Sequence, residues 1–143
     1  MKIDSRSGLW PAWWMLGDNH PTVGWPLSGE VDVVEDYGFS AVESSVHTST
    51  HPPAITTYSG GMANDSGFHT FRMDWSAEGM TFSRDGVPHA GVTWDPNDPA
   101  IPDEPSRPMF MLLNLAVGGD IGAPPPDASF PVDLTVDYVK AWQ

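Results

Sequence analysis

The chain has 143 residues and no cysteine, and its 19 acidic residues against 6 basic residues give a formal net charge of −13. This length suits a single domain over residues 1–143 with a sizeable core, and the absence of cysteine excludes disulfides, thiolate metal sites and a cysteine nucleophile. The charge argues against nucleic acid and against an anionic membrane surface as partners, whereas a neutral polysaccharide is compatible with it. Simple solubility explains the charge equally well.

The elements expected along the chain are strands joined by loops. Segment 8–17 is apolar, carries three tryptophans, and predicts a buried strand that is followed by a loop at 18–26. High β-propensity or alternation predicts further strands at 30–36, 41–50, 68–75, 79–83, 87–89, 109–117 and 132–142. Asp85-Gly86 predicts a hairpin turn. Proline, glycine and small polar residues predict loops at 54–65, 93–107 and 123–131. We find no helical period, and seven or eight strands at short spacing predict an all-β sandwich.

The most informative strand is the acidic segment Gly29–Asp36, which places three carboxylates among valines. Strict alternation would put Glu30 and Asp32 on one face but send Glu35 to the apolar face. A buried carboxylate without a partner is costly. One extra residue at Val33-Val34, a β-bulge, returns Glu35 to the face of the other two acids. We therefore predict a bulged strand that presents three acids in a row.

Three acids on one face have more than one use. Two carboxylates that flank a bond are the usual equipment for glycoside hydrolysis, in which one attacks the sugar and the other protonates the leaving oxygen. A negative neighbour helps the acid to retain its proton. A calcium site and a solvated acidic surface are the alternatives that spacing alone leaves open.

Tryptophan favours a carbohydrate ligand, because sugar rings stack on aromatic rings. Trp10, Trp13, Trp14 and Trp25 all precede Glu30 by twenty residues or fewer. Neighbours in a strand face opposite ways, so one of Trp13 and Trp14 belongs to the core and the other to the acidic face. Packing in the core is the alternative for most of these rings. Trp25 lies in a Gly-Trp-Pro loop just before the acids and is the one most expected to contact a ligand.

Several segments resemble glycoside hydrolase family 16, in the family's order and over nearly the whole chain. GLWPAWWMLG at 8–17 is similar to its GLWPAFWMLG segment. Residues 25–35 resemble its catalytic segment WPxxGEIDIxE, in the bulged ExDxxE version. Residues 114–119 match LNLAVGG, and residues 130–131 with 136–139 match the ending fP…VDYV.

The resemblance implies a concanavalin A-like jelly roll of two antiparallel sheets and retaining endo-hydrolysis of a β-linked glucan, as in the laminarinase branch. Carried over by position, Glu30 is the nucleophile, Asp32 the assisting acid and Glu35 the general acid/base. It also implies an extracellular protein whose partner is a β-1,3- or mixed β-1,3-1,4-glucan and which requires no cofactor. The expected substrate-binding residues are Trp10, Trp14, Trp25, His47 and Asn114. For His47, an ordinary half-exposed strand residue is the alternative.

The chain departs from the family at its N-terminus. Family members have several strands before the GLWP segment, whereas seven residues precede Gly8 here, so we expect the sandwich to lack its N-terminal strands. Many members bind a structural calcium ion through N-terminal residues and the aspartate of the VDYV ending, so the resemblance makes Asp137 the one remaining calcium ligand. No oligomeric state follows from the sequence.

Two other functions remain open from the sequence. A glucan-binding module or an inactive fragment of the same fold would bind glucan without cleaving it. An agarase, another galactan hydrolase or a transglycosylase would use the same acids on a different acceptor or glycan.

Overall fold

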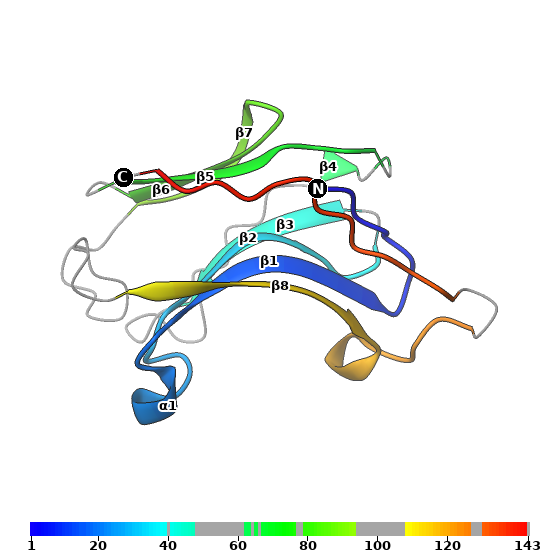
Figure 1. Cartoon of the computed structure of the whole chain (residues 1–143), viewed down its shortest axis with the longest axis horizontal. Coiled ribbons are helices and arrows are strands. Elements are labelled where there is room, and N and C mark those ends of the chain that lie inside the picture. The colour runs from blue at the N-terminus through cyan, green and yellow to red at the C-terminus, as the bar shows by residue number, and fades with distance from the viewer. Residues whose placement is uncertain are drawn as a thin grey trace.

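The computed structural model describes residues 1–39, 41–47, 62–63, 65, 67–76, 79–93, 108–126 and 130–142. These residues form two antiparallel sheets that lie as two layers (Figure 1). The larger sheet has the order β4-β3-β2-β1-β8, and its strands are Met62–Ala63, Ala41–His47, Glu30–Asp36, Leu9–Gly17 and Met109–Val117 in that order. The smaller sheet is β5 (Phe71–Ser76), β6 (Gly79–Arg84) and β7 (Val87–Thr93). The predicted all-β sandwich of antiparallel sheets is confirmed.

Strand β2 lies in the middle of the larger sheet and carries the predicted bulge. Its pairing with β3 runs from Asp32↔Ser45 directly to Glu35↔Glu43, so two valines stand opposite one residue. Its pairing with β1 also slips by one residue between Trp13 and Trp14. The bulge therefore exists relative to both neighbouring strands, and Glu35 returns to the face of Glu30 and Asp32.

The core lies between the two sheets and is built from the apolar face of β2 and β3. Val31, Val33, Val34, Val42 and Val46 pack there against residues of the smaller sheet, namely Phe71, Met80 and Phe82. Burial of these side chains fixes which face of β2 points inward, because a shift by one residue would exchange the valines for the acids. The acids therefore occupy the outer face, which is the face of the larger sheet turned away from the smaller sheet. Figure 1 shows this sheet curved, with its hollow side outward.

The hairpin predicted at Asp85-Gly86 joins β6 to β7. Both residues have positive φ angles, 52° for Asp85 and 79° for Gly86. That backbone is the one a two-residue turn needs to match the twist of its strands.

Several expectations along the chain differ from the structure. The loop predicted at 18–26 contains a four-residue helix, α1 (His20–Val23), which is too short to leave a period in the sequence. The strand predicted at 132–142 forms no strand in the described part of the chain, where its only bridge joins Thr135 to Lys2. Alternation alone does not make a strand, because each strand needs a neighbour to accept its hydrogen bonds. Within the loop predicted at 54–65, Met62–Ala63 form the short strand β4, because β3 offers them a neighbour to pair with, and most of the remainder lies outside the described residues. The loop predicted at 93–107 lies outside the described residues except for Thr93, which ends β7.

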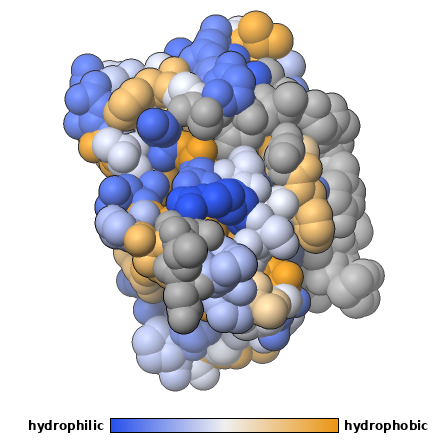
Figure 2. All heavy atoms as spheres, turned by 90° about the vertical axis from the view of Figure 1, so that its right-hand side faces the viewer, coloured by the Kyte–Doolittle hydropathy of each residue, from blue (hydrophilic) through white to orange (hydrophobic). Residues whose placement is uncertain are grey.

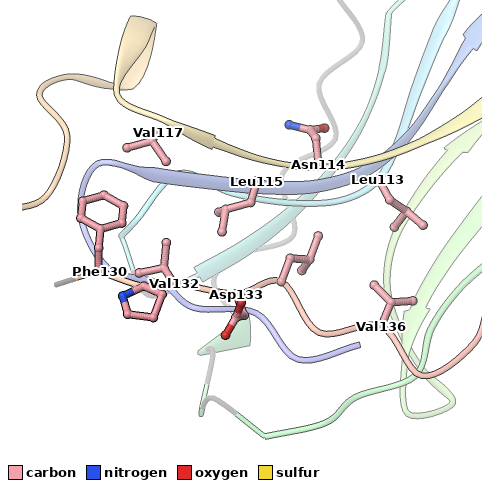
Figure 3. Close-up of a pocket in the computed structure, with 10 residues that line it drawn as sticks. Leu113, Asn114, Leu115, Val117, Phe130, Val132, Asp133 and Val136 are labelled. Carbon is pink, nitrogen blue, oxygen red and sulfur yellow. The ribbon is translucent and has the colours of Figure 1, made fainter.

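Strand β8 forms an edge of the larger sheet, and its inward side chains line an open groove of about 810 Å³. Figure 3 shows Leu113 and Leu115 pointing toward segment 130–136, whereas Asn114 points to the other side of β8. Leu113 is 42% exposed although it faces the interior of the sandwich. This groove is separate from the outer face that carries the acids.

The short helices lie at the ends of the larger sheet. One is α1, and the other is a single 3₁₀ turn, η1 (Gly119–Ile121), that follows β8. Within the described residues no helix has the length and apolar character to cross a membrane. On the side of the molecule seen in Figure 2, hydrophilic and hydrophobic residues are interspersed, and the hydrophobic ones form several small patches.

Candidate active site

Glu30, Asp32 and Glu35 form one row on the outer face of β2. Their partners across the ladder to β3 are His47, Ser45 and Glu43. Although these acids face away from the core, the side chain of Glu30 is only 19% exposed, Glu35 is 6% exposed and Asp32 is 1% exposed. Three carboxylates in a row that are largely shielded from solvent do not form an ordinary solvated surface. The solvated acidic surface was one of the alternatives that the sequence left open.

Glu35 accepts hydrogen bonds from two residues, and a third polar group lies close to it. The indole Nε1–H of Trp10 donates to Oε1 at 2.9 Å, and the Tyr37 hydroxyl donates to Oε2 at 3.0 Å. Ser45 Oγ lies 3.4 Å from Oε2. Burial, together with the negative charge of Asp32, raises the pKa of Glu35 to about 7 despite the two donors. Glu35 can therefore hold a proton near neutral pH and release it in a reaction.

Tyr37 is fixed by the same interactions. Burial and the charge of Glu35 raise the pKa of its phenol, so the hydroxyl remains a donor. Its ring lies against Trp10, with the ring centroids 5.2 Å apart and the planes at 48°. The two aromatic residues thus form a wall that orients the Glu35 carboxyl.

Asp32 lies between the two glutamates and is bound to β3. It accepts a hydrogen bond from Ser45 Oγ, and His47 Nε2 lies 3.0 Å from its Oδ2. Burial lowers the pKa of His47, but the hydrogen bond and charge of Asp32 and the charge of Glu30 outweigh it, so the pKa is raised overall. The imidazolium form is thereby favoured beside two carboxylates.

Glu30 is the most accessible of the three acids. Burial and the charge of Asp32 raise its pKa to about 7, whereas His47 and a hydrogen bond from Trp25 act in the opposite direction. His47 Nε2 lies 3.9 Å from Glu30 Oε1. Of the two glutamates, Glu30 is the one with a cationic partner at this distance in the described part of the chain, so when the two share one proton it resides more favourably on Glu35.

The structure brings most of the sequence-predicted ligand residues to this face. Trp10 and Trp14 lie on the outer face of β1, where Trp14 pairs with Asp32, whereas Trp13 packs against the core. Trp25 is 52% exposed, and its ring centroid lies 5.6 Å from that of His47. These rings line the approach to the acids.

Asn114 and Asp137 lie farther out. Asn114 Oδ1 accepts a hydrogen bond from Trp14 Nε1 at 2.7 Å, two strands away from β2. Asp137 is exposed in the C-terminal segment, where its charge acts on the amino group of Met1 rather than on the acids.

Sequence reasoning missed Tyr37 and Ser45 as members of the site. Both carry a readable signal, because Tyr37 is two residues after Glu35 on the same face and Ser45 precedes His47 by two in an alternating strand. What the sequence lacks is the register that places Ser45 opposite Asp32.

One group of side chains could hold a metal ion. Donor atoms of Glu30, Asp32 and His47 lie within 4.8 Å of one another, and among the described residues no other group of three meets this criterion. A metal there would have to displace the proton that His47 shares with Asp32. Asp137 belongs to no such group within the described part of the chain.

Chemically, this face offers a protonated carboxyl group and an ionised carboxylate, separated by a third acid that raises the pKa of both. Two carboxyl groups with these unequal roles are what acid-assisted displacement at a sugar carbon requires. The aromatic rings of Trp10, Trp14 and Trp25 border the same surface.

Known proteins of similar sequence include β-glucanases. The chain is 31% identical to a beta-glucanase of Rhodothermus marinus over 99% of its own length and 54% of that protein. It is 32% identical to glucan endo-1,3-beta-glucosidase A1 of Niallia circulans, over 99% of this chain and 23% of that one. The chain thus spans about half, or less, of the length of the curated relatives it matches.

The fold is also found among solved structures. A laminarinase from Flavobacterium sp. UMI-01 superimposes with a TM-score of 0.75 at 35% identity, covering 91% of this chain and 58% of that one. The jelly-roll sandwich implied by the sequence resemblance is therefore confirmed. A model of the family Glycosyl hydrolases family 16 matches residues 1–140, which is nearly the whole chain, and the protein belongs to that family.

Proposed function

We propose that this protein is a retaining endo-hydrolase of β-1,3-glucan or mixed β-1,3-1,4-glucan. The observation that carries the proposal is the buried Glu35, whose pKa is raised to about 7, on the same strand face as Glu30. The beta-glucanase and laminarinase relatives support the reaction class and the glucan substrate.

In the proposed first step, Glu30 attacks the anomeric carbon while Glu35 protonates the departing glycosidic oxygen. The carbon–oxygen bond of the glycosidic linkage breaks, and a covalent ester between the sugar and Glu30 forms. Trp10 and Tyr37 hold Glu35, and their hydrogen bonds stabilise the carboxylate that the lost proton leaves behind.

In the second step, Glu35 acts as the base. It takes a proton from water, the water oxygen attacks the anomeric carbon, and Glu30 leaves as a carboxylate. Asp32 supplies the negative charge that favours the protonated form of Glu35 before the first step. His47 favours the ionised form of Glu30, which the attack requires.

The proposal needs no cofactor, because two carboxylates and water complete both steps. Asp137 remains a proposed calcium ligand only for structural stability. Treatment with EDTA is therefore expected to leave the rate of hydrolysis unchanged.

The test is release of reducing sugar from laminarin, with agarose and other galactans as parallel substrates. Hydrolysis of laminarin that Glu35→Gln reduces by about 10²–10⁴-fold supports the proposal, since general acid catalysis contributes an effect of this size. Glu30→Gln removes the nucleophile and should abolish the reaction. Folded protein that binds laminarin without releasing sugar would indicate a binding module instead. Cleavage of galactan alone would keep the mechanism and refute the substrate.

A further inference from the structure

Because of the bulge in β2, the buried backbone carbonyl of Val33 falls outside the regular hydrogen-bond ladder to β3. The pairing passes from Asp32↔Ser45 to Glu35↔Glu43, so Ser44 alone faces both Val33 and Val34. Val33 is buried in the core. A buried carbonyl without a donor is unfavourable, so an unsupported bulge would tend to slip by one residue.

Ser44 supplies the missing donor. Its Oγ hydroxyl donates to the carbonyl oxygen of Val33 at 2.8 Å, from a side chain that is fully buried. The side chain lies on the core side of β3, so Ser44 touches none of the three acids and is opposite in direction to its neighbour Ser45, which contacts Asp32.

His89 of β7 braces Ser44 from the other sheet. Its Nε2 lies 3.0 Å from Ser44 Oγ. Because the serine hydrogen is used by Val33, Ser44 Oγ accepts this second bond and His89 donates Nε2–H. Burial also lowers the pKa of His89, so the ring is neutral and donates in this tautomer. The Nδ1 atom is buried and has no hydrogen-bond partner in the described part of the chain.

We propose that Ser44, braced by His89, is a positioning residue that holds the Val33-Val34 bulge and thereby aims Glu35 at the outer face. The inference rests on the proposed function in so far as Glu35 is the general acid/base. It goes beyond that function by assigning a role to two residues on the far side of the sheet from the substrate.

The first test is the kinetics of Ser44→Ala, with Ser83→Ala as a matched control, since Ser83 is a buried serine in the smaller sheet. We expect kcat on laminarin to fall roughly tenfold, because small misplacements of a reacting group are costly. KM should change by less than about twofold, as the residue does not contact the substrate. Ser83→Ala should behave like the wild type.

The second test does not require activity. The indole Nε1–H of Trp10 donates to Glu35, so its NMR resonance reports both the position and the titration of that carboxyl. We expect Ser44→Ala to shift this resonance and its titration midpoint, and Ser83→Ala to change neither. Trp10→Phe assigns the resonance. An unchanged resonance and midpoint in Ser44→Ala would overturn the proposal, even if kcat falls.

His89→Ala provides a second variant in case Ser44→Ala does not fold. It removes the brace but keeps the Ser44–Val33 bond, so the Trp10 resonance should move in the same direction by a smaller amount. Adding His89→Ala to Ser44→Ala should produce no further shift, because His89 acts through Ser44. A full additional shift, or none in His89→Ala alone, contradicts the coupling. If the wild type releases no sugar, the proposed function fails, while the resonance still decides the role of Ser44.

Discussion

Replacing Tyr37 with phenylalanine removes one hydrogen bond to Glu35 and little else. The hydroxyl donates to Oε2 at 3.0 Å, and the ring, which packs against Trp10, is retained. The bond is stronger to the ionised carboxylate than to the protonated acid. Its loss should therefore raise the pKa of Glu35 above its present value of about 7.

The size of the expected change in the pKa of Glu35 follows from the strength of the hydrogen bond that Tyr37 donates to it. A hydrogen bond to a charged group contributes about 1.5–3 kcal/mol. Part of it survives when Glu35 is protonated, so a difference of about 1.4 kcal/mol between the two forms is reasonable, which equals about one pKa unit. The proposed reaction needs protonated Glu35, so activity is lost as pH rises through its pKa. The basic limb of kcat/KM should therefore move from about pH 7 in the wild type to about pH 8 in Tyr37→Phe.

The assay is the pH dependence of kcat/KM on laminarin, which reports the free enzyme. Tyr138→Phe is the matched control, because Tyr138 is exposed and lies beneath the Lys140 ammonium, 4.9 Å from it. Its profile should coincide with that of the wild type. A basic limb that stays in place or moves to lower pH in Tyr37→Phe would refute the assignment of Glu35 as the proton donor.

Two further predictions concern charge and packing. Asp32→Asn keeps the shape of the side chain but removes the charge that raises the pKa values of Glu30 and Glu35, so the basic limb should move to lower pH; a limb at higher pH would contradict the electrostatics. Phe82→Ala should lower the free energy of unfolding by about 3–5 kcal/mol in urea titrations, because Phe82 is fully buried between the sheets. Val87→Ala in the next strand is the control, since Val87 is 58% exposed and a surface change of this kind is expected to cost less than about 0.5 kcal/mol. Equal losses in the two variants would mean that Phe82 does not belong to the core.

The local chemistry of the site is readable in the sequence because it depends on neighbours in the chain. Alternation conflicts with burial at Glu35, and the bulge at Val33-Val34 is the simplest resolution, as the register confirms. The Asp85-Gly86 hairpin follows in the same way, because a two-residue turn needs positive φ angles that these residue types accept.

Tertiary structure decided what depends on partners distant in the chain. Adjacent tryptophans must face opposite ways, but only the pairing of Trp14 with Asp32 assigns Trp14 to the acids and Trp13 to the core. The hydrogen bond from Trp10 to Glu35 spans 25 residues, and the bond between Ser44 and His89 spans 45. The apolar alternation at 132–142 predicts a strand that does not form in the described part of the chain, where Thr135 bridges to Lys2 alone. Residue types and spacing determine which face of its own strand a side chain takes. The contacts that shift a pKa or complete a hydrogen-bond ladder come from other strands, and the local sequence does not specify the register of those strands.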